Sequence, residues 1–134
     1  MAAAMSVFLC ARDPRALVDQ LVAGLGFEEL VVWPDADGGI AHAELRLGDA
    51  VVLVQTDHVG YRKPEVTDRC VGAGTVLTLD GPDEVDAVHA RAVAAGMTSL
   101  IAPQDTPWGN HRAELLDREG YQWSICTYRP GGQG

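Results

Sequence analysis

The order of predicted strands and helices occurs twice in this chain, and that repeat restricts the fold more than any other feature of the sequence. Each half has a strand, a helix and three further strands, which gives the order β-α-β-β-β twice. Gly26-Phe27 in the first half corresponds to Gly96-Met97 in the second, an offset of about 70 residues. We therefore expect one domain over residues 1–134, made of two modules at about 5–57 and 73–128.

The first half has clear element boundaries. Asp13-Pro14 supply an N-cap and a proline at the first helical position, and the apolar side chains that follow recur with a helical period up to Gly24. Strands are expected before and after this helix, at residues 5–11, 27–33, 40–47 and 50–56. Gly48-Asp49 separates the last two strands, and glycine at the first position of a two-residue turn favours a type II′ hairpin.

The second half repeats this pattern. Pro82 opens a helix that Gly96 ends, and strands are expected at residues 74–80, 99–102, 111–116 and 121–128. Each helix can cover one face of its own sheet, which leaves the other face to be closed by the other half or by a ligand. The expected fold class is α+β, with two βαβββ modules that form a pair of half-barrels around a cleft. The modules pair within one chain or exchange between two chains, because both arrangements bury the same apolar faces.

The hairpin at Gly48-Asp49 has a register that can be derived, because a two-residue turn fixes which residues lie opposite each other. His42 is expected opposite Gln55, and Glu44 opposite Leu53. Side chains alternate between the two faces of a strand. One face is apolar and suits packing on a helix: Ala41, Ala43, Leu45, Leu47, Val52 and Val54. The other face is polar or lines the cleft: His42, Glu44, Arg46, Leu53 and Gln55.

Acidic residues outnumber basic residues by 19 to 10, which gives a net charge of −9 at pH 7. Such a chain repels phosphate backbones and anionic lipids, so we expect neither nucleic acid nor a membrane as a partner. The charge serves either solubility or the attraction of a cationic ligand. Because no secretory signal and no apolar run of about 20 residues is present, we expect a cytoplasmic protein. Its three cysteines are expected to be reduced: Cys10, Cys70 and Cys126.

Three polar side chains on the cleft face are the candidates for chemistry: His42, Glu44 and Gln55. Imidazole, carboxylate and amide oxygens can each ligate a metal, but such residues also form hydrogen-bonded contact rows on strands. The remaining histidines lack metal-binding spacing and are interpreted as surface residues: His58, His89 and His111. Three aromatic residues at strand ends or in loops either stack on a flat ligand or cover the core: Trp33, Tyr61 and Trp108.

The repeated element order and two segments of sequence resemble the vicinal oxygen chelate superfamily. That superfamily includes glyoxalases, extradiol dioxygenases, fosfomycin-modifying thiol transferases and bleomycin-type resistance proteins. The segments are HAELRLGDAVVLV at 42–54 and TPWGNHRAELLDREGYQWSICTYRPG at 106–131. The second contains W-G-x-x-R, ending at Arg112, and then L-x-D-x-E-G-Y-x-W, which is similar to the ending of the bleomycin-resistance-like and PhnB-like branches. Arg118 stands where a turn proline is usual.

Metal-dependent members of this superfamily take one ligand from each of four strands, the first and the last strand of each module. On this chain the corresponding positions are Ser6, Leu53, Thr75 and Ser124. None of them is an ordinary ligand for a hard or borderline divalent ion, and Leu53 cannot ligate at all. We therefore expect no metal and no other cofactor, and we do not expect the metal-assisted activities of the superfamily.

The resemblance then implies a metal-free binding protein, similar to the dimers that sequester bleomycin or mitomycin in a groove without altering the drug. We expect a homodimer whose ligand is a small molecule, a cationic or aromatic natural-product antibiotic. No residue is assigned a catalytic role, and the residues expected to contact the ligand are Trp33, His42, Glu44, Leu53, Gln55, Tyr61, Trp108, Arg112, Ser6, Thr75 and Ser124. Two alternatives stay open. One is a lyase-type or isomerase-type enzyme that uses Glu44 as a base or an atypical metal site, and the other is a metabolite-binding accessory or sensor protein.

Overall fold

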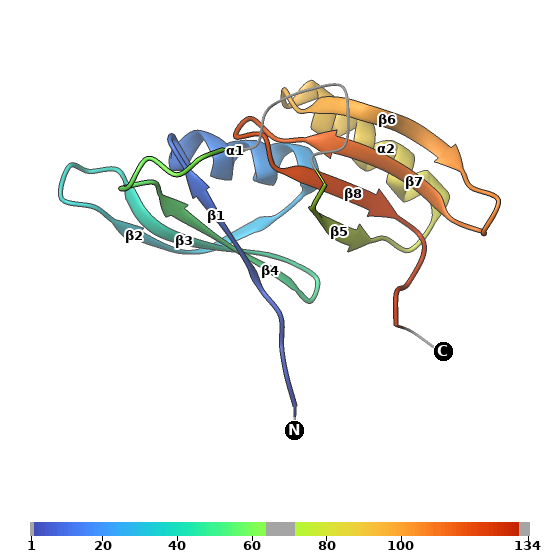
Figure 1. The fold of residues 1–134 in the computed structure, drawn as a ribbon, viewed down its shortest axis with the longest axis horizontal. Helices are drawn as coiled ribbons and strands as arrows, with labels where there is room; N and C mark the ends of the chain where they lie inside the picture. The colour runs from blue at the N-terminus through green and yellow to red at the C-terminus, as the bar shows by residue number, and fades with distance from the viewer. Residues whose placement is uncertain (1, 64–71, 132–134) are drawn as a thin grey trace.

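The computed structural model describes residues 2–63 and 72–131 and contains two four-stranded mixed sheets and two helices (Figure 1). The first sheet has the order β1-β4-β3-β2. Its module consists of β1 (Val7–Ala11), α1 (Pro14–Leu25), β2 (Glu28–Pro34), β3 (Ile40–Leu47) and β4 (Ala50–Thr56). The second sheet has the order β5-β8-β7-β6. Its module consists of β5 (Gly74–Thr78), α2 (Pro82–Ala94), β6 (Thr98–Asp105), β7 (His111–Leu116) and β8 (Gln122–Cys126). The predicted α+β class with two βαβββ modules is confirmed, and the described strands do not close into a barrel.

Local signals fix the element boundaries of the first module. The Asp13 carboxylate accepts a hydrogen bond from the backbone N–H of Ala16 at 3.1 Å, so it caps α1 as the sequence predicts. The helix ends where Gly26 adopts a φ of 86°, a left-handed conformation that glycine reaches without strain. Gly48 has a φ of 58° at the first position of the β3–β4 turn. The predicted hairpin register, with His42 opposite Gln55 and Glu44 opposite Leu53, is confirmed.

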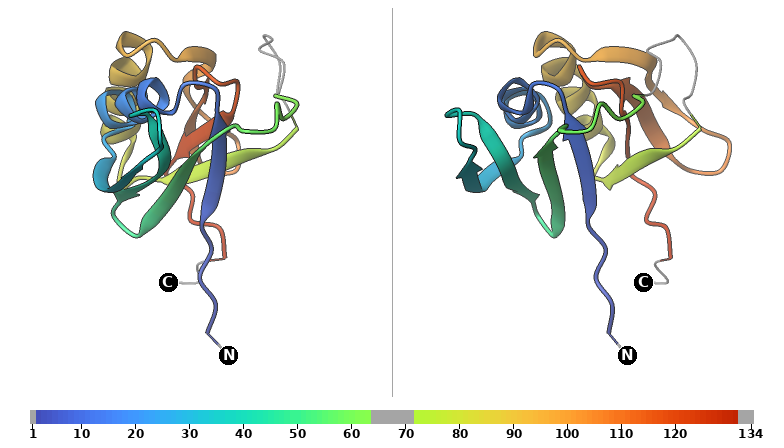
Figure 2. Two further views of the ribbon diagram at one scale, coloured as in Figure 1. Left: turned by 90° about the vertical axis from the view of Figure 1, so that its left-hand side faces the viewer. Right: turned by 60° about the vertical axis from the view of Figure 1, so that its left-hand side comes forward.

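The two modules are joined by their helices, which lie side by side and pack closely (Figures 1 and 2). The contact is close because α1 carries Gly24 at the crossing point. A Cβ atom at that position would lie 3.1 Å from the Cα of Ala92 and 3.2 Å from the Cβ of Ala95, both on the α2 side. Both ends of the described chain leave the fold on the side opposite the helices (Figure 2). The sheet faces that the helices do not cover are called the open faces below.

One apolar core runs through both modules on the helix side of the sheets. The predicted apolar face of the β3–β4 hairpin is buried there, with Ala43, Leu45, Val52 and Val54 almost fully inaccessible to solvent. Phe27, just before β2, meets Trp123 of β8 edge to face, with ring centroids 5.8 Å apart. The free thiols of Cys10 and Cys126 are buried, whereas Cys70 lies outside the described residues.

The turn between β7 and β8 is organised by a buried carboxylate, that of Asp117. One of its oxygens accepts backbone N–H bonds from Glu119 at 2.9 Å and Tyr121 at 3.1 Å, and the other accepts the indole N–H of Trp123 at 2.8 Å. These bonds favour the charged form, but burial outweighs them and raises the pKa of Asp117 to about 6. The contribution of this turn to the free energy of unfolding therefore depends on pH.

A leucine in place of Gly24 should force the two helices apart, because its side chain would overlap the backbone of α2. We expect Gly24→Leu to lower the free energy of unfolding by about 2 kcal/mol after the gain in helix propensity is allowed for. Ala23→Leu is the matched control, since Ala23 is exposed and a leucine there should change stability by no more than about 0.5 kcal/mol. Urea unfolding of the three proteins gives the comparison, and equal stability of the two variants would show that the crossing tolerates a side chain.

The raised pKa of Asp117 should appear as a falling stability with rising pH. The folded state holds this proton up to about pH 6, whereas the unfolded state releases it near its ordinary pKa of about 4, so unfolding becomes easier between these values. Relative to Asp117→Asn, which does not titrate, the wild-type protein should lose up to about 3 kcal/mol of unfolding free energy across this range. Urea midpoints measured at several pH values test this, and parallel curves for the two proteins would contradict it.

Candidate functional site

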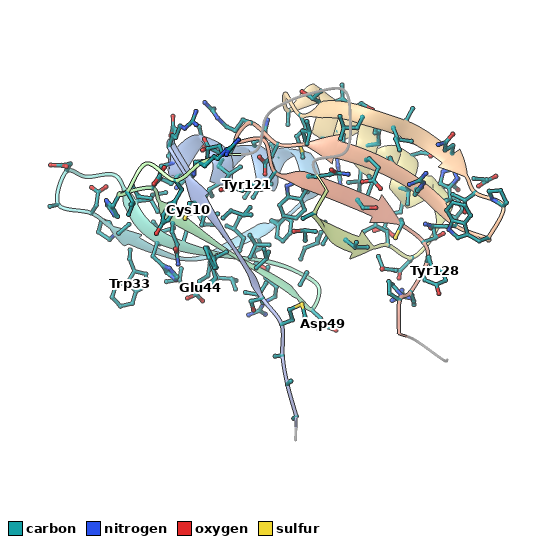
Figure 3. The ribbon with its side chains drawn as sticks, in the orientation of Figure 1. Cys10, Trp33, Glu44, Asp49, Tyr121 and Tyr128 are labelled. Atoms are coloured by element: carbon teal, nitrogen blue, oxygen red, sulfur yellow. The ribbon has the colours of Figure 1, made fainter. Side chains whose placement is uncertain are left out.

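The open face of the first sheet carries a row of polar side chains on β3 and β4. His42 and Glu44 alternate along β3, and the His42 Nε2 lies 3.0 Å from the Glu44 Oε2. Gln55 and Leu53 of β4 lie opposite them, and Cys10 of β1 is in register with Gln55. Figure 3 shows that Glu44 and Trp33 project to the same side of this sheet. The residues predicted from strand alternation to share this face do share it.

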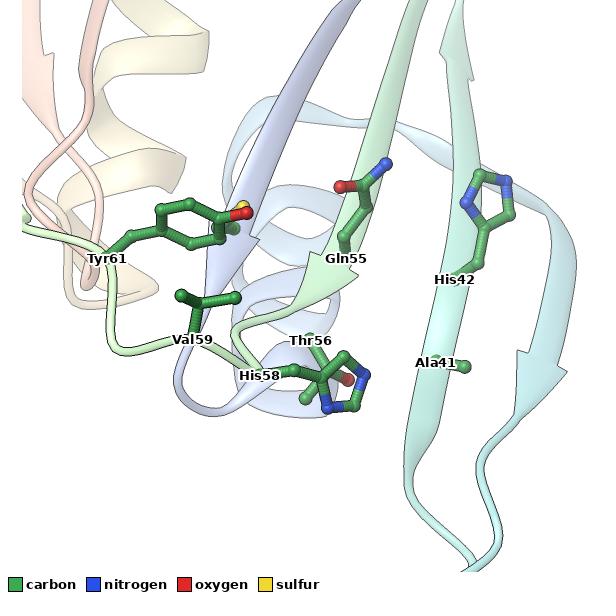
Figure 4. A pocket seen from close by; sticks show the side chains of 8 residues that line it. Ala41, His42, Gln55, Thr56, His58, Val59 and Tyr61 are labelled. Carbon is green, nitrogen blue, oxygen red and sulfur yellow. The ribbon is translucent and has the colours of Figure 1, made fainter.

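A pocket of about 360 Å³ lies at one end of this face, where β4 leads into residues 57–63 (Figure 4). It brings together three of the predicted contact residues, His42, Gln55 and Tyr61. The other lining residues are Cys10, Ala41, Thr56, His58 and Val59. His58, interpreted from the sequence as a surface histidine, is exposed and also lines this pocket. Two imidazoles, an amide, a phenol and a thiol thus surround a space that suits a small polar or aromatic group.

The rim of this pocket, residues 57–63, is held by the side chain of Asp57. Its Oδ1 accepts hydrogen bonds from the backbone N–H groups of Tyr61, Val59 and Gly60 at 3.0, 3.1 and 2.8 Å. The bond from Tyr61 is the main reason that the pKa of Asp57 lies below its usual value. The rim is therefore a defined turn built around an ionised carboxylate, and it presents Tyr61 to the pocket.

The open face of the second sheet carries a related row on β7 and β8. The guanidinium of Arg112 lies over the ring of Trp108 at 5.9 Å, and its Nη1 is 3.6 Å from Glu114 Oε1. Glu114 also accepts a hydrogen bond of 3.1 Å from the side chain of Gln122. Among the described residues, the Nε of Arg112 is buried without a hydrogen-bond partner. Arg112 and Trp108, both predicted contact residues, are thus brought together.

The duplicated fold makes the two rows equivalent by register. Glu44 is opposite Leu53 in the first sheet, and Glu114 is opposite Ser124 in the second. Each glutamate has a basic neighbour two residues before it, His42 or Arg112. Glu114 was not among the residues predicted from the sequence, although the spacing of HAELRL against HRAELL shows the correspondence. The chain therefore carries the same aromatic, basic and acidic side-chain types on both open faces.

The four positions predicted to correspond to the fold family's metal ligands lie on β4 and β8 and on or just before their parallel neighbours β1 and β5. Ser6 precedes β1 and is exposed, and Leu53 and Ser124 are half-buried. Thr75 requires a correction, because it pairs with the buried Trp123, while its neighbour Val76 pairs with Ser124. Thr75 therefore lies on the opposite face of the strand from Ser124. A shift of one residue exchanges the two faces of a strand, so the true counterpart of Ser6 is Gly74.

These positions do not offer the donors that a metal ion needs. With Gly74 in place of Thr75, the set is a serine, a leucine, a glycine and a second serine, and at most the hydroxyls could approach an ion. Within residues 2–63 and 72–131, no three histidine, cysteine, aspartate or glutamate side chains gather as a metal site would require. The residues present do not fit the metal of the fold family.

Apolar side chains occupy the surroundings of these positions instead. A cavity of about 550 Å³ follows the seam between β1 and β5 and is lined by Met5, Ser6, Val7, Ala50, Val51, Val52, Gly74, Thr75, Val76, Leu77 and Pro130. On either side of the seam Phe8 is 61% exposed and Val76 is 52% exposed. A second cavity of about 360 Å³ continues along the seam past Phe8 to Tyr121. The seam lies between the modules, where a cleft was expected, but none of the predicted cleft-face residues of β3 and β4 lines either cavity.

The remaining predicted residues are less closely gathered. Trp33 and Trp108 are more than half exposed and line none of these cavities, so Tyr61 is the one predicted stacking residue within a described pocket. His111 lies on the helix side, between Asp86 of α2 at 2.8 Å and Asp105 at 2.7 Å, and the Asp86 bond chiefly raises its pKa. His89 contacts Ser99 at 2.8 Å, and burial lowers its pKa. These two histidines take no part in the open faces.

The repeated βαβββ module and its two open faces define a two-module protein of the glyoxalase type. The model of the Glyoxalase/Bleomycin resistance protein/Dioxygenase superfamily matches residues 4–125, and the chain belongs to this superfamily. An uncharacterized protein of Mycobacterium bovis is 30% identical over 131 residues, which cover 91% of this chain and 81% of that protein. Neither described helix has the length and apolar character that a membrane crossing requires.

Solved structures agree with this assignment. The crystal structure of TioX from Micromonospora sp. ML1 is 30% identical, covers 95% of this chain and 100% of its own, and has a TM-score of 0.70. The fosfomycin resistance protein FosX from Mesorhizobium loti covers 97% of this chain and 95% of its own, with a TM-score of 0.69 but an identity of 12%. The likeness to FosX therefore concerns the fold alone.

Proposed function

We propose that this protein binds an aromatic small molecule of the natural-product antibiotic class against its open faces and sequesters it without chemical change. The observation that carries the proposal is the composition of the seam. Where the fold family places metal ligands, this chain has serine, leucine and glycine, flanked by the exposed side chains of Phe8 and Val76. An apolar seam can hold a flat ring system, and its side chains lack the donors that would bind a Lewis-acid metal.

The proposed contacts divide into three kinds. Tyr61, Trp33 and Trp108 stack on the rings of the ligand, because exposed aromatic side chains near a groove offer large flat surfaces. Polar groups of the ligand bind His42, Glu44, Gln55 and Arg112. Ser6, Gly74 and Thr75 line the seam cavity. Leu53 and Ser124, in register with Phe8 and Val76, add contacts beside the seam.

We also propose that the working form is a homodimer. In the single chain several large apolar side chains of the open faces and the neighbouring edge strand stay exposed, among them Phe8, Trp33 and Val76. Phe8 and Val76 flank the seam, and exposed apolar surface beside a groove is typical of an interface or a ligand site. A second chain placed across the open faces would cover these side chains and enclose the ligand.

One observation favours a second function, general base catalysis. Glu44 is hydrogen-bonded to His42 at 3.0 Å on the open face, so the pair could accept a proton from a bound substrate and hold it. Chemical recovery of a bound compound separates the two functions. Sequestration returns the compound unchanged, whereas catalysis gives a product in the wild-type protein that is lost in Glu44→Gln.

The proposal predicts that the protein does not retain a divalent ion. Purified protein incubated with excess Zn²⁺, Ni²⁺, Mn²⁺ or Fe²⁺ and then desalted should hold less than about 0.1 equivalent of each by mass spectrometry, because the donor set is too poor. Retention of about one equivalent would contradict the proposal. A parallel measurement on His42→Ala and Glu44→Ala would then show whether that ion sits on the β3 row.

Trp108 should contribute directly to binding of an aromatic cationic probe. We expect Trp108→Ala to weaken the binding of bleomycin by more than about tenfold. A stacked indole contributes about 1.4 kcal/mol or more to the binding free energy. Titrations followed by calorimetry give the affinity. Tyr128→Ala is the matched control, since Tyr128 is also half-exposed but belongs to the C-terminal segment and should leave the affinity unchanged. Equal affinities of the wild-type protein and Trp108→Ala would remove Trp108 from the site.

A further inference from the structure

A buried group of charges includes both end residues of the pocket rim, Asp57 and Lys63. Lys63, the only lysine in the chain, has its Nζ 3.7 Å from Asp57 Oδ2 and 4.0 Å from Glu119 Oε1. The side chains of Lys63 and Asp57 are each 4% exposed, and that of Glu119 is 6% exposed. Burial of a charge raises the free energy of the folded state unless the charge is paired. Each member of this group therefore needs its partners in place.

The group joins three segments that are distant in the sequence. Lys63 Nζ donates a hydrogen bond of 2.5 Å to the backbone carbonyl of Cys10 in β1, and the hydroxyl of Tyr121 donates to the same carbonyl at 2.9 Å. Glu119, in the β7–β8 turn, accepts the backbone N–H of Arg12 at 2.8 Å. Lys63 belongs to the segment that follows β4. It therefore links this segment to the end of β1 in the first module and to the β7–β8 turn in the second.

The same group fixes the pocket rim at both of its ends. The Oδ1 atom of Asp57 accepts the backbone N–H bonds of the rim, and its Oδ2 atom pairs with Lys63. Lys63 in turn ties the far end of the rim to the Cys10 carbonyl. Between these two anchors lie His58, Val59 and Tyr61, three of the eight residues that line the pocket.

We propose that Lys63 is a positioning residue, which holds the rim with Tyr61 against β1 and thereby controls access to the inner end of the pocket. Cys10 shows the effect in the structure. Its side chain shares the open face with Gln55 and lines the pocket, yet the residue is only 7% exposed. The rim covers it. This role concerns the pocket itself and does not depend on which ligand fills it.

Removal of the lysine charge leaves the carboxylates of Asp57 and Glu119 in a buried space without their shared cation. The repulsion and the missing hydrogen bond to the Cys10 carbonyl both favour a rim that moves away from β1 and admits water. Arginine keeps the charge but has a larger, planar head, so Lys63→Arg should restore part of the anchoring. Arg62, the neighbouring basic residue, is exposed, so Arg62→Met removes the same charge without touching the buried group.

The rate of Cys10 alkylation measures how well the rim covers the pocket. In a Cys70→Ser background, each protein is treated with iodoacetamide under native conditions, and the modified peptides are quantified by mass spectrometry. We expect Lys63→Met to raise the alkylation rate of Cys10 at least about tenfold, with Arg62→Met unchanged and Lys63→Arg between them. Cys126, buried in β8 at 3% exposure, reports global unfolding in the same sample and should keep its rate.

A neutral version of the group separates positioning from general stability. Lys63→Met combined with Asp57→Asn and Glu119→Gln contains no unpaired buried charge, so it should recover much of the thermal stability that Lys63→Met loses. It still lacks the tie to the Cys10 carbonyl, and Cys10 should therefore stay rapidly alkylated. The proposal is overturned if the rate of Cys10 does not change in Lys63→Met. It is equally overturned if Cys10 and Cys126 rise together, or if the neutral version returns Cys10 to the wild-type rate.

Discussion

The close crossing of α1 and α2 is the contact on which the arrangement of the open faces depends. Gly24 allows the helix backbones to approach so far that a Cβ atom would meet the Cα of Ala92 at 3.1 Å. Each helix is also packed on its own sheet, so the crossing fixes both sheets relative to each other. The helix sides merge into one core, and the functional surfaces are left on the other side. The seam between β1 and β5 is a consequence of this arrangement.

Strand alternation then decides which chemistry reaches the open faces. On the helix side, β3 and β4 present small and branched apolar residues and β8 presents Trp123 and Ile125, because that face is buried between layers. The alternate positions face away from the core, and there the chain has polar rows on β3 and β7 and apolar side chains on β1 and β5. The seam thus lacks metal donors, although the backbone has the plan of the fold family. The side chains on one face of each strand pack in the core, and those on the other face can differ without changing the fold.

The sequence predicted those parts of the structure whose causes are local. The Asp13 cap, the Gly48 turn and the register of His42 with Gln55 each depend on residues close together in the chain, and each is confirmed. The position of Thr75 was wrong by one residue, because β5 pairs in parallel with β8 across a long connection and no tight turn sets its register. The contacts of Lys63 could not be predicted at all. They join it to Cys10, Asp57, Glu119 and Tyr121, and only the folded arrangement of the modules brings these residues together.

The strong negative charge of the chain gives little information about the open faces themselves. Glu44 is in contact with His42, and Glu114 with Arg112 and Gln122, so neither carboxylate stands alone in its row. Asp57 and Glu119 are paired with Lys63, and other acidic residues such as Asp35 and Asp83 lie in loops or at helix ends. The long-range field of −9 can raise the encounter rate of a cation, but it is screened within about 10 Å at moderate salt. Discrimination between ligands on such a surface must come from short-range contact with the aromatic and apolar side chains, and the position of the Tyr61 rim then matters more than the net charge.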